Sequence, residues 1–160
     1  MTTGPPAWLQ PLVGAAQDVM PEMLSRFRPP REGGRQSAVL VLFAEGPAGP
    51  ELLFIERAST LRSHAGQPAF PGGALDPEDE GPVAAALREA REEVGLDPDG
   101  VQVLATLPTL WLPPSGFVVT PVLGWWRRPG PMEPQGAHAP SIRRDPARAA
   151  AWKSALGVRC

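Results

Sequence analysis

Three glutamates carry the strongest chemical signal in this 160-residue sequence. Glu89, Glu92 and Glu93 are spaced i, i+3 and i+4 within segment 82–94, which is rich in alanine, glutamate and arginine. On a helix this spacing places three carboxylates on one arc, where like charges repel each other. Mg²⁺ would offset the repulsion, because it takes oxygen ligands and typically binds one or two carboxylates together with substrate phosphates. The alternative is a solvated acidic face bridged by neighbouring arginines.

A glycine pair lies just ahead of this segment, in the sequence Phe70-Pro71-Gly72-Gly73. Glycine allows a close backbone approach, so carbonyl or N–H groups of such a turn can point at a metal ion or a phosphate. An ordinary turn is the alternative. The turn and the three glutamates together define the candidate site.

Segment 82–94 has the start and stop signals of a helix. Pro82 suits the first turn and Gly95 suits the position after the last turn. At about 100° per residue, one apolar stripe faces the core. Its members are Val83, Ala86, Leu87, Ala90 and Val94.

Apolar runs predict strands on both sides of this helix. We expect strands at residues 37–43, 52–57, 101–107 and 117–126. Pro121 indicates an edge position or a bulge in the last of them. The connection 58–77 is long and rich in glycine and proline, which is typical of a functional loop.

The ends of the chain differ from this central part. Apolar residues at spacings of three and four predict a helical segment within 1–30, interrupted at Pro21. We assign residues 31–128 to the principal domain. In 129–160, a proline- and arginine-rich tail, we expect no strand and at most one short helix, with disorder as the alternative to a packed structure.

Composition excludes several classes of function. The net charge is −2 and the acidic residues concentrate in 76–99, so a nucleic-acid binder is not expected. No apolar run approaches the ~20 residues of a membrane span, and the first residues lack the pattern of a signal peptide. The one cysteine, Cys160, excludes a disulfide framework within the chain. We therefore expect a cytoplasmic protein.

The residues around the glutamates resemble the Nudix hydrolase family. The Nudix box is a glycine, five residues, Glu, seven residues, then Arg-Glu-U-x-Glu-Glu-x-Gly-U, where U is a bulky aliphatic residue. The second half matches residues 88–96 position for position, with Ala90 as a small U. The first half departs, because six residues separate Gly73 from Glu80. The resemblance therefore leaves open whether Glu80 or Glu78 takes the position of the first glutamate.

A second pattern resembles the coenzyme A pyrophosphatase subgroup of this family. Its signature is Leu-Leu-Thr-x-Arg, Ser or Ala, three residues, Arg, three residues, Gly, three residues, then Phe-Pro-Gly-Gly. Arg57-Ala58, Arg62, Gly66 and Phe70 keep every one of these spacings, whereas residues 53–56 depart from Leu-Leu-Thr. Arginine suits coenzyme A, which carries a diphosphate and a 3′-phosphate, since a guanidinium group pairs phosphate oxygens in a planar fork.

The resemblance implies an α/β fold, a Nudix-type α/β/α sandwich with a mixed sheet, and hydrolysis of a diphosphate with Mg²⁺ or Mn²⁺. It assigns the metal to Glu89 and Glu93, with Glu92 adjacent, and makes Glu92 and Glu89 candidates for the general base. Arg88 would orient the carboxylates. It implies substrate contacts for six residues, Arg57, Arg62, Gly66, Phe70, Gly72 and Gly73.

Coenzyme A or a derivative would be cleaved to 3′,5′-ADP and 4′-phosphopantetheine or its acyl form. The alternatives are another nucleoside diphosphate derivative or an oxidised nucleotide as substrate, or a truncated, non-catalytic binding protein on the same fold. The partner would be this small molecule, with a homodimer as an option. Members of the subgroup usually continue with more sheet and a helix, so the atypical residues 129–160 raise the alternative of an incomplete domain.

Overall fold

A computed structural model describes residues 4–20, 33–56, 68–112, 116–135 and 141–155, without the side chains of Arg148 and residues 152–155. The helices are η1 (Ala7–Leu9), α1 (Gln10–Gln17), α3 (Pro82–Val94), η2 (Pro98–Gly100) and α4 (Pro146–Ala155). The strands are β1 (Arg35–Gly46), β2 (Gly49–Glu56), β3 (Pro68–Ala69), β4 (Gly72–Ala74), β5 (Val101–Thr106), β6 (Leu110–Leu112), β7 (Phe117–Trp126) and β8 (Ser141–Asp145).

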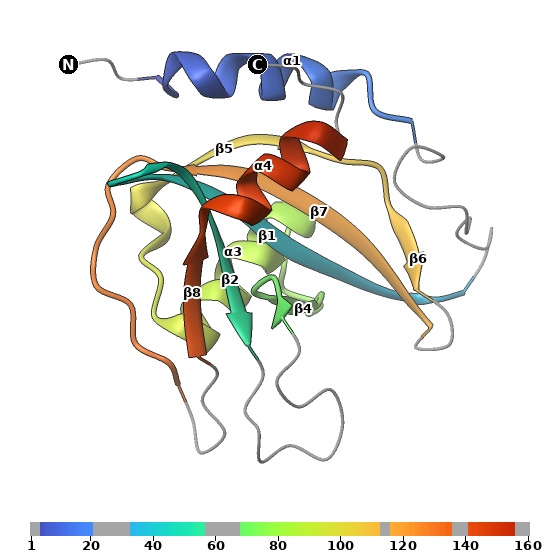
Figure 1. Cartoon of the computed structure of the whole chain (residues 1–160). Helices are drawn as coiled ribbons and strands as arrows, with labels where there is room; N and C mark the ends of the chain where they lie inside the picture. Colours follow the sequence, from blue (N-terminus) through green and yellow to red (C-terminus); the bar gives the residue numbers. More distant parts are fainter. Residues whose placement is uncertain (1–3, 21–32, 57–67, 113–115, 136–140, 156–160) are drawn as a thin grey trace.

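One mixed sheet organises the described residues (Figure 1). Its central order is β3-β2-β1-β7-β5, with β4 on β1, β6 on β7 and β8 on β2. Strands β1 and β7 are parallel and the other pairs are antiparallel. Both central strands are almost wholly buried, which explains their nearly continuous apolar sequences.

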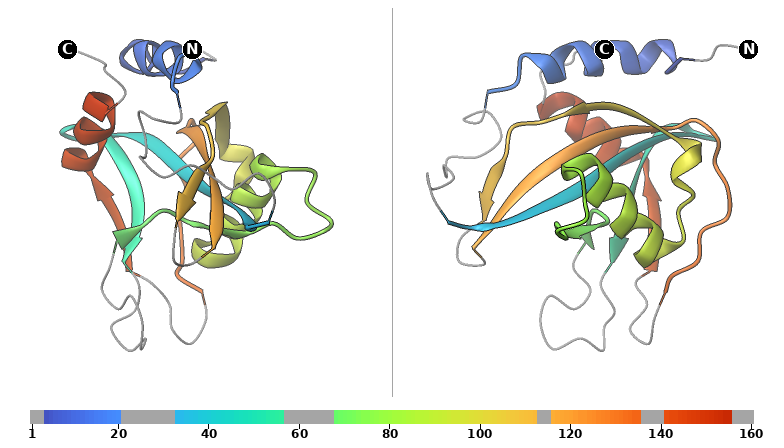
Figure 2. Two further views of the ribbon diagram at one scale, coloured as in Figure 1. Left: turned by 90° about the vertical axis from the view of Figure 1, so that its right-hand side faces the viewer. Right: turned by 180° about the vertical axis from the view of Figure 1, so that it is seen from behind.

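Helices cover both faces of the sheet (Figure 2). Helix α3 packs on one face, where its small side chains Ala86 and Ala90 meet Leu40 and Leu42 of β1 in one hydrophobic cluster. Helix α1 covers the other face, where Leu12 packs with other apolar side chains in a second cluster that also includes Ala149 of α4. The predicted α/β/α sandwich with a mixed sheet is therefore confirmed.

Segment 68–74 enters the sheet where β1 and β2 separate. The two strands pair from Gly46↔Gly49 to Leu42↔Leu53. Beyond that point β3 pairs with the end of β2, and β4 pairs with residues 37–39 of β1. Since α3 packs over β1 and β4, the glycine pair of β4 is held directly beneath this helix.

Pro121 does not mark an edge or a bulge, so that prediction is wrong. Strand β7 lies at the centre of the sheet, and Pro121 pairs with Val39 of β1. On its other side, β5 pairing ends at Val122, β6 pairing begins at Val119, and Pro121 only accepts a hydrogen bond from Leu107 N–H (2.9 Å). The proline thus occupies the gap between β5 and β6, where a missing N–H costs no ladder bond.

The stretch after Trp126 contains a strand that was not expected. Strand β8 pairs antiparallel with β2, from Leu52↔Asp145 to Glu56↔Ser141. Its sequence lacks apolar alternation because arginines take the place of hydrophobic residues. Arg144 lies 2.7 Å from the buried carboxylate of Glu51 and stacks over the Trp126 ring at 5.4 Å. The single short helix expected there is confirmed as α4.

Other predicted elements agree with the structure, and some fall outside the described residues. The helix at 82–94 has the predicted bounds, and the four predicted strands correspond to β1, β2, β5 and β7. The N-terminal helix ends at Gln17, and residues 1–3 and 21–30 of the predicted segment lie outside the described part. The boundaries at residues 30 and 128 stay a prediction. In the described part of the chain, no helix combines the length and hydrophobicity needed to cross a bilayer.

Candidate functional site

Helix α3 presents its carboxylates to the glycine turn because its opposite side is fixed by packing. Ala86, Ala90 and Val94 are fully buried against the sheet. The helix ends as the sequence indicates, with Gly95 in the left-handed conformation (φ +70°) and its N–H bonded to the Arg91 carbonyl. The arc carrying the three glutamates is thereby oriented by the core.

Glu89 and Glu93 both contact the glycine pair. The Gly72 N–H donates a hydrogen bond to Glu93 Oε1 at 3.1 Å. A Cβ at residue 73 would lie 2.6 Å from the Cδ of Glu89, so this carboxylate occupies the space that the absent side chain leaves. The structure therefore brings together two predicted metal ligands and the two glycines.

Arg88 is the cation that offsets the repulsion among the carboxylates. Its Nη1 donates to Glu92 Oε2 at 3.1 Å and to Glu89 Oε1 at 3.2 Å. Its Nη2 also donates to the Ala74 carbonyl at 3.2 Å, which ties the guanidinium to β4. These contacts place Arg88 between two of the carboxylates and β4, while its orienting role stays a prediction.

Asp79 holds this arginine in place, and sequence reasoning missed it. Arg88 Nε and Nη2 donate to the two Asp79 carboxylate oxygens at 3.0 and 2.9 Å, a bidentate pair. The Asp79 side chain is 7% exposed, and it also accepts from the Asp76 N–H at 2.8 Å. Neither Glu78 nor Glu80 has a contact with Arg88 in the structure; Asp79 lies between them.

A spacing signal could have identified Asp79. Five residues separate it from Gly73, which is the first interval of the Nudix box. An aspartate stands here where the box has its first glutamate. The extra residue then lies between Asp79 and Arg88, at the start of α3.

The ion pair shifts both pKa values. The hydrogen bonds from Arg88 and from the Asp76 backbone, with the arginine contribution the larger, lower the pKa of Asp79. The same hydrogen bond, followed by that to Glu92, raises the pKa of Arg88 above its already high value. Both groups are therefore charged at neutral pH.

The donor set fits a hard divalent cation. Carboxylate oxygens of Glu89 and Glu93 lie against the glycine pair of β4, and carboxylate oxygens are ligands that Mg²⁺ and Mn²⁺ prefer. Within the described residues, no three acidic, histidine or cysteine side chains already converge as a preformed metal cluster. Arg88 instead draws Glu92 and Glu89 toward itself, so metal binding would require these two side chains to turn.

The remaining predicted contacts lie elsewhere or outside the described part. Phe70 packs against the hydrophobic cluster beneath α1. Arg57, Arg62 and Gly66 lie outside the described residues, so their predicted role in substrate binding stays a prediction.

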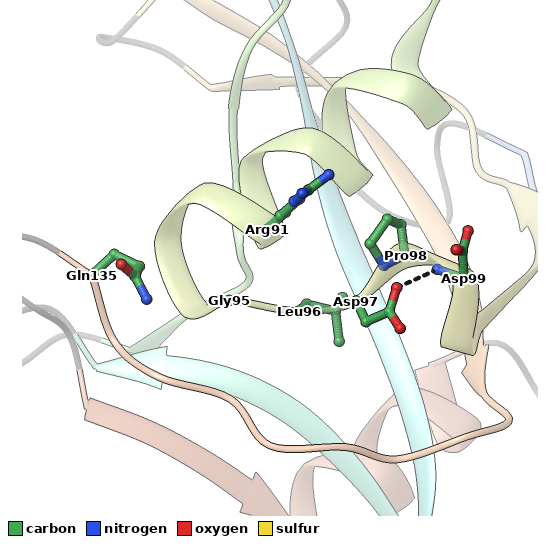
Figure 3. A pocket seen from close by; sticks show the side chains of 7 residues that line it. All are labelled: Arg91, Gly95, Leu96, Asp97, Pro98, Asp99 and Gln135. Atoms are coloured by element: carbon green, nitrogen blue, oxygen red, sulfur yellow. Dashed lines mark hydrogen bonds between the residues drawn. The ribbon is translucent and has the colours of Figure 1, made fainter.

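A pocket of about 560 Å³ opens beside the C-terminal end of α3 (Figure 3). It is lined by Arg91, Gly95, Leu96, Asp97, Pro98, Asp99 and Gln135. None of the three site carboxylates lines it. Asp97 accepts from the Asp99 N–H at 3.0 Å and so caps the start of η2. The pocket is thus distinct from the candidate site.

Comparisons with known proteins agree with this geometry. Residues 34–126 match the NUDIX domain family. An uncharacterized Nudix hydrolase, NudL, from Cronobacter sakazakii is 54% identical over 90 residues, 56% of this chain and 46% of that protein. NudL of Klebsiella aerogenes is 48% identical over 110 residues, 64% of this chain and 90% of that protein. The chain spans about half the length of the Cronobacter relative.

Solved structures share the fold. The Nudix hydrolase RenU of M. smegmatis has a TM-score of 0.60 and 27% identity, covering 79% of this chain and 86% of that chain. An Ap4A hydrolase of C. elegans has a TM-score of 0.60 at 18% identity, covering 78% of this chain and 93% of that chain. The matched domain, the glutamate-bearing helix and the arginine network together show that the chain belongs to the Nudix family.

Proposed function

We propose that this chain is a pyrophosphohydrolase that cleaves the diphosphate of coenzyme A or its derivatives. The observation that carries the proposal is the arrangement of Glu89 and Glu93 against the Gly72-Gly73 turn, with Arg88 holding the neighbouring carboxylates. A non-catalytic protein has no need of three repelling carboxylates on one helix. Relatives named as Nudix hydrolases support the reaction class.

Glu89 and Glu93, with Glu92 adjacent, would hold Mg²⁺ or Mn²⁺. An ion held there would neutralise diphosphate oxygens and make the attacking water easier to deprotonate. Glu93 is kept at the turn by the Gly72 N–H, and Arg88 keeps Glu92 and Glu89 from moving apart. Asp79 holds Arg88 in place, and Glu92 and Glu89 would turn from this guanidinium toward the metal ion when it binds.

In the proposed reaction, a water oxygen bonds to one phosphorus and the bond from that phosphorus to the bridging oxygen breaks. Glu92 or Glu89 accepts the proton of the attacking water, and the bridging oxygen leaves with the other phosphate. The products from coenzyme A are 3′,5′-ADP and 4′-phosphopantetheine. The exposed carboxylate of Glu92, 57% accessible, is open to solvent for this proton transfer.

Coenzyme A is proposed over other diphosphates on the strength of the spacing Arg57-Ala58, Arg62, Gly66 and Phe70. Coenzyme A bears a 3′-phosphate besides its diphosphate, so it offers more oxygens to arginine than ADP-ribose does. This substrate, a cytoplasmic location and a homodimer stay predictions.

A panel of substrates distinguishes a coenzyme A pyrophosphatase from a hydrolase of other nucleotides and from a non-catalytic binding protein. Purified chain with Mg²⁺ would be offered coenzyme A, 3′-dephospho-coenzyme A, ADP-ribose and an oxidised dGTP analogue, with kcat/KM measured for each. We expect coenzyme A to be preferred, and Arg62→Ala to lose most of the preference over the dephospho form. Equal kcat/KM values for all four substrates would contradict the coenzyme A assignment but would still support a diphosphate hydrolase. No turnover of any would support a binding protein.

A further inference from the structure

We propose that residues 133–135 position the carboxylate-bearing last turn of α3, and Glu93 in particular. This inference rests on the proposed function for its consequences in catalysis, but its structural part is testable without substrate. The segment follows β7 and lies beyond residues 34–126, which match the family. Its contacts with the helix are backbone hydrogen bonds.

The last carbonyls of a helix have no partner within the helix and need one outside it. In α3 the Glu93 carbonyl accepts from the Gln135 N–H at 3.0 Å, and the Val94 carbonyl accepts from the Glu133 N–H at 2.8 Å. The segment is itself braced, because Gln135 Nε2 donates to the Glu133 carbonyl at 2.9 Å. Two consecutive helix carbonyls are thus satisfied by one short segment.

Glu93 is held from two directions as a result. Its carboxylate accepts from the Gly72 N–H of the glycine turn, and its carbonyl accepts from Gln135. Gly95, with φ +70°, ends the helix directly after Val94, and the Glu133 nitrogen lies within van der Waals distance, 3.4 Å, of where a Cβ of residue 95 would stand. The segment therefore connects the end of the helix to the chain that leaves β7.

The open pocket beside this turn gives the hydrogen bonds their importance. Gln135 and Arg91 line the pocket from opposite sides of the helix end (Figure 3). Val94 anchors the turn to the sheet on its buried side, and the pocket opens beside the same turn at Arg91 and Gly95. Losing the hydrogen bonds would therefore let the last turn fray and would loosen Glu93.

Proline at residue 135 removes the N–H that the Glu93 carbonyl accepts, while Gln135→Ala keeps it and serves as the matched control. Two readouts are measured without substrate: hydrogen exchange of the Glu92, Glu93 and Val94 amides, and Mn²⁺ binding by electron paramagnetic resonance. We expect Gln135→Pro to accelerate exchange by about two- to tenfold, the weight of one hydrogen bond, and to weaken Mn²⁺ binding similarly. Gln135→Ala should change both far less.

A folded Gln135→Pro variant with the exchange and Mn²⁺ affinity of the original protein would overturn the proposal. If that variant does not fold, exchange in the unaltered protein decides. The Glu133 and Gln135 amides should then be protected to the same degree as the last turn of α3, and rapid exchange at both would overturn the proposal. If Gln135→Pro accelerates exchange but the original protein hydrolyses no diphosphate, the positioning role is supported and only the proposed function is contradicted.

Discussion

Replacing the two adjacent glycines by alanine should affect different properties. Gly72→Ala should lower thermal stability, whereas Gly73→Ala should lower the affinity for Mn²⁺. Neither Gly72 nor Gly73 has a positive φ, so the restriction at both positions is space and not backbone conformation. A Cβ at residue 72 would clash with the Ala38 carbonyl and lie 2.8 Å from the Val39 Cα, both in the backbone of β1. The three atoms nearest to a Cβ at residue 73 all belong to the end of the Glu89 side chain, at 2.6 to 2.9 Å.

The magnitudes follow from what must move. At residue 72 the strand backbone cannot retreat, and overpacking of this kind costs about 1–3 kcal/mol. For a domain of this size, that cost lowers Tm by about 2–12 °C. At residue 73 the flexible carboxylate of Glu89 turns aside, so we expect Tm to change by no more than about 2 °C. Because the displaced group is a proposed metal ligand, Mn²⁺ affinity should fall about tenfold or more.

Thermal unfolding without metal and Mn²⁺ titration by electron paramagnetic resonance measure the two effects separately. Gly130→Ala is the control, because nothing lies within 4 Å of a Cβ at that exposed position. Gly73→Ala with unchanged Mn²⁺ affinity would refute the assignment of Glu89 to the metal. Gly72→Ala with an unchanged Tm would refute the close approach of β4 to β1.

Three further changes probe the same account. Glu93→Gln should retain the fold, since its amide oxygen can still accept from the backbone, and should lose Mg²⁺-dependent turnover; undiminished turnover would contradict the metal assignment. Asp79→Asn should lower Tm at pH 7, and because folding lowers the pKa of Asp79, the deficit should shrink as pH falls below about 4. A deficit that grows on acidification would exclude the ion pair with Arg88. Arg144→Ala leaves the carboxylate of Glu51, 11% exposed, without its guanidinium and should cost about 1–3 kcal/mol by denaturant unfolding. Adding Glu51→Gln should recover part of this loss, and no recovery would argue against the pairing.

The central elements could be predicted because local and tertiary preferences agree in them. Helix α3 has a proline at its start, glycine after its end and one apolar stripe, and the structure gives it the predicted bounds. The apolar runs of β1 and β7 are buried at the centre of the sheet, where such runs belong. The same helix carries the three carboxylates that the spacing placed on one arc.

The remaining features depend on partners that the local sequence does not reveal. Strand β8 has Ile142 as its one aliphatic residue, and its pairing with β2 is completed by Arg144 against Glu51 and Trp126. The position of Pro121 is explained only by the gap between β5 and β6. Asp79 was missed because its role is set by its contact with Arg88 and not by its residue type.

Metal-dependent hydrolysis of coenzyme A is tested most directly by product analysis after incubation of the purified chain with coenzyme A and Mg²⁺ in H₂¹⁸O. Mass spectrometry should find 3′,5′-ADP and 4′-phosphopantetheine, with ¹⁸O in one of the two phosphates, and chelation of the metal or the Glu93→Gln change should abolish both products. Intact coenzyme A in the presence of Mg²⁺ or Mn²⁺, or products that form equally well with Glu93→Gln, would contradict the account.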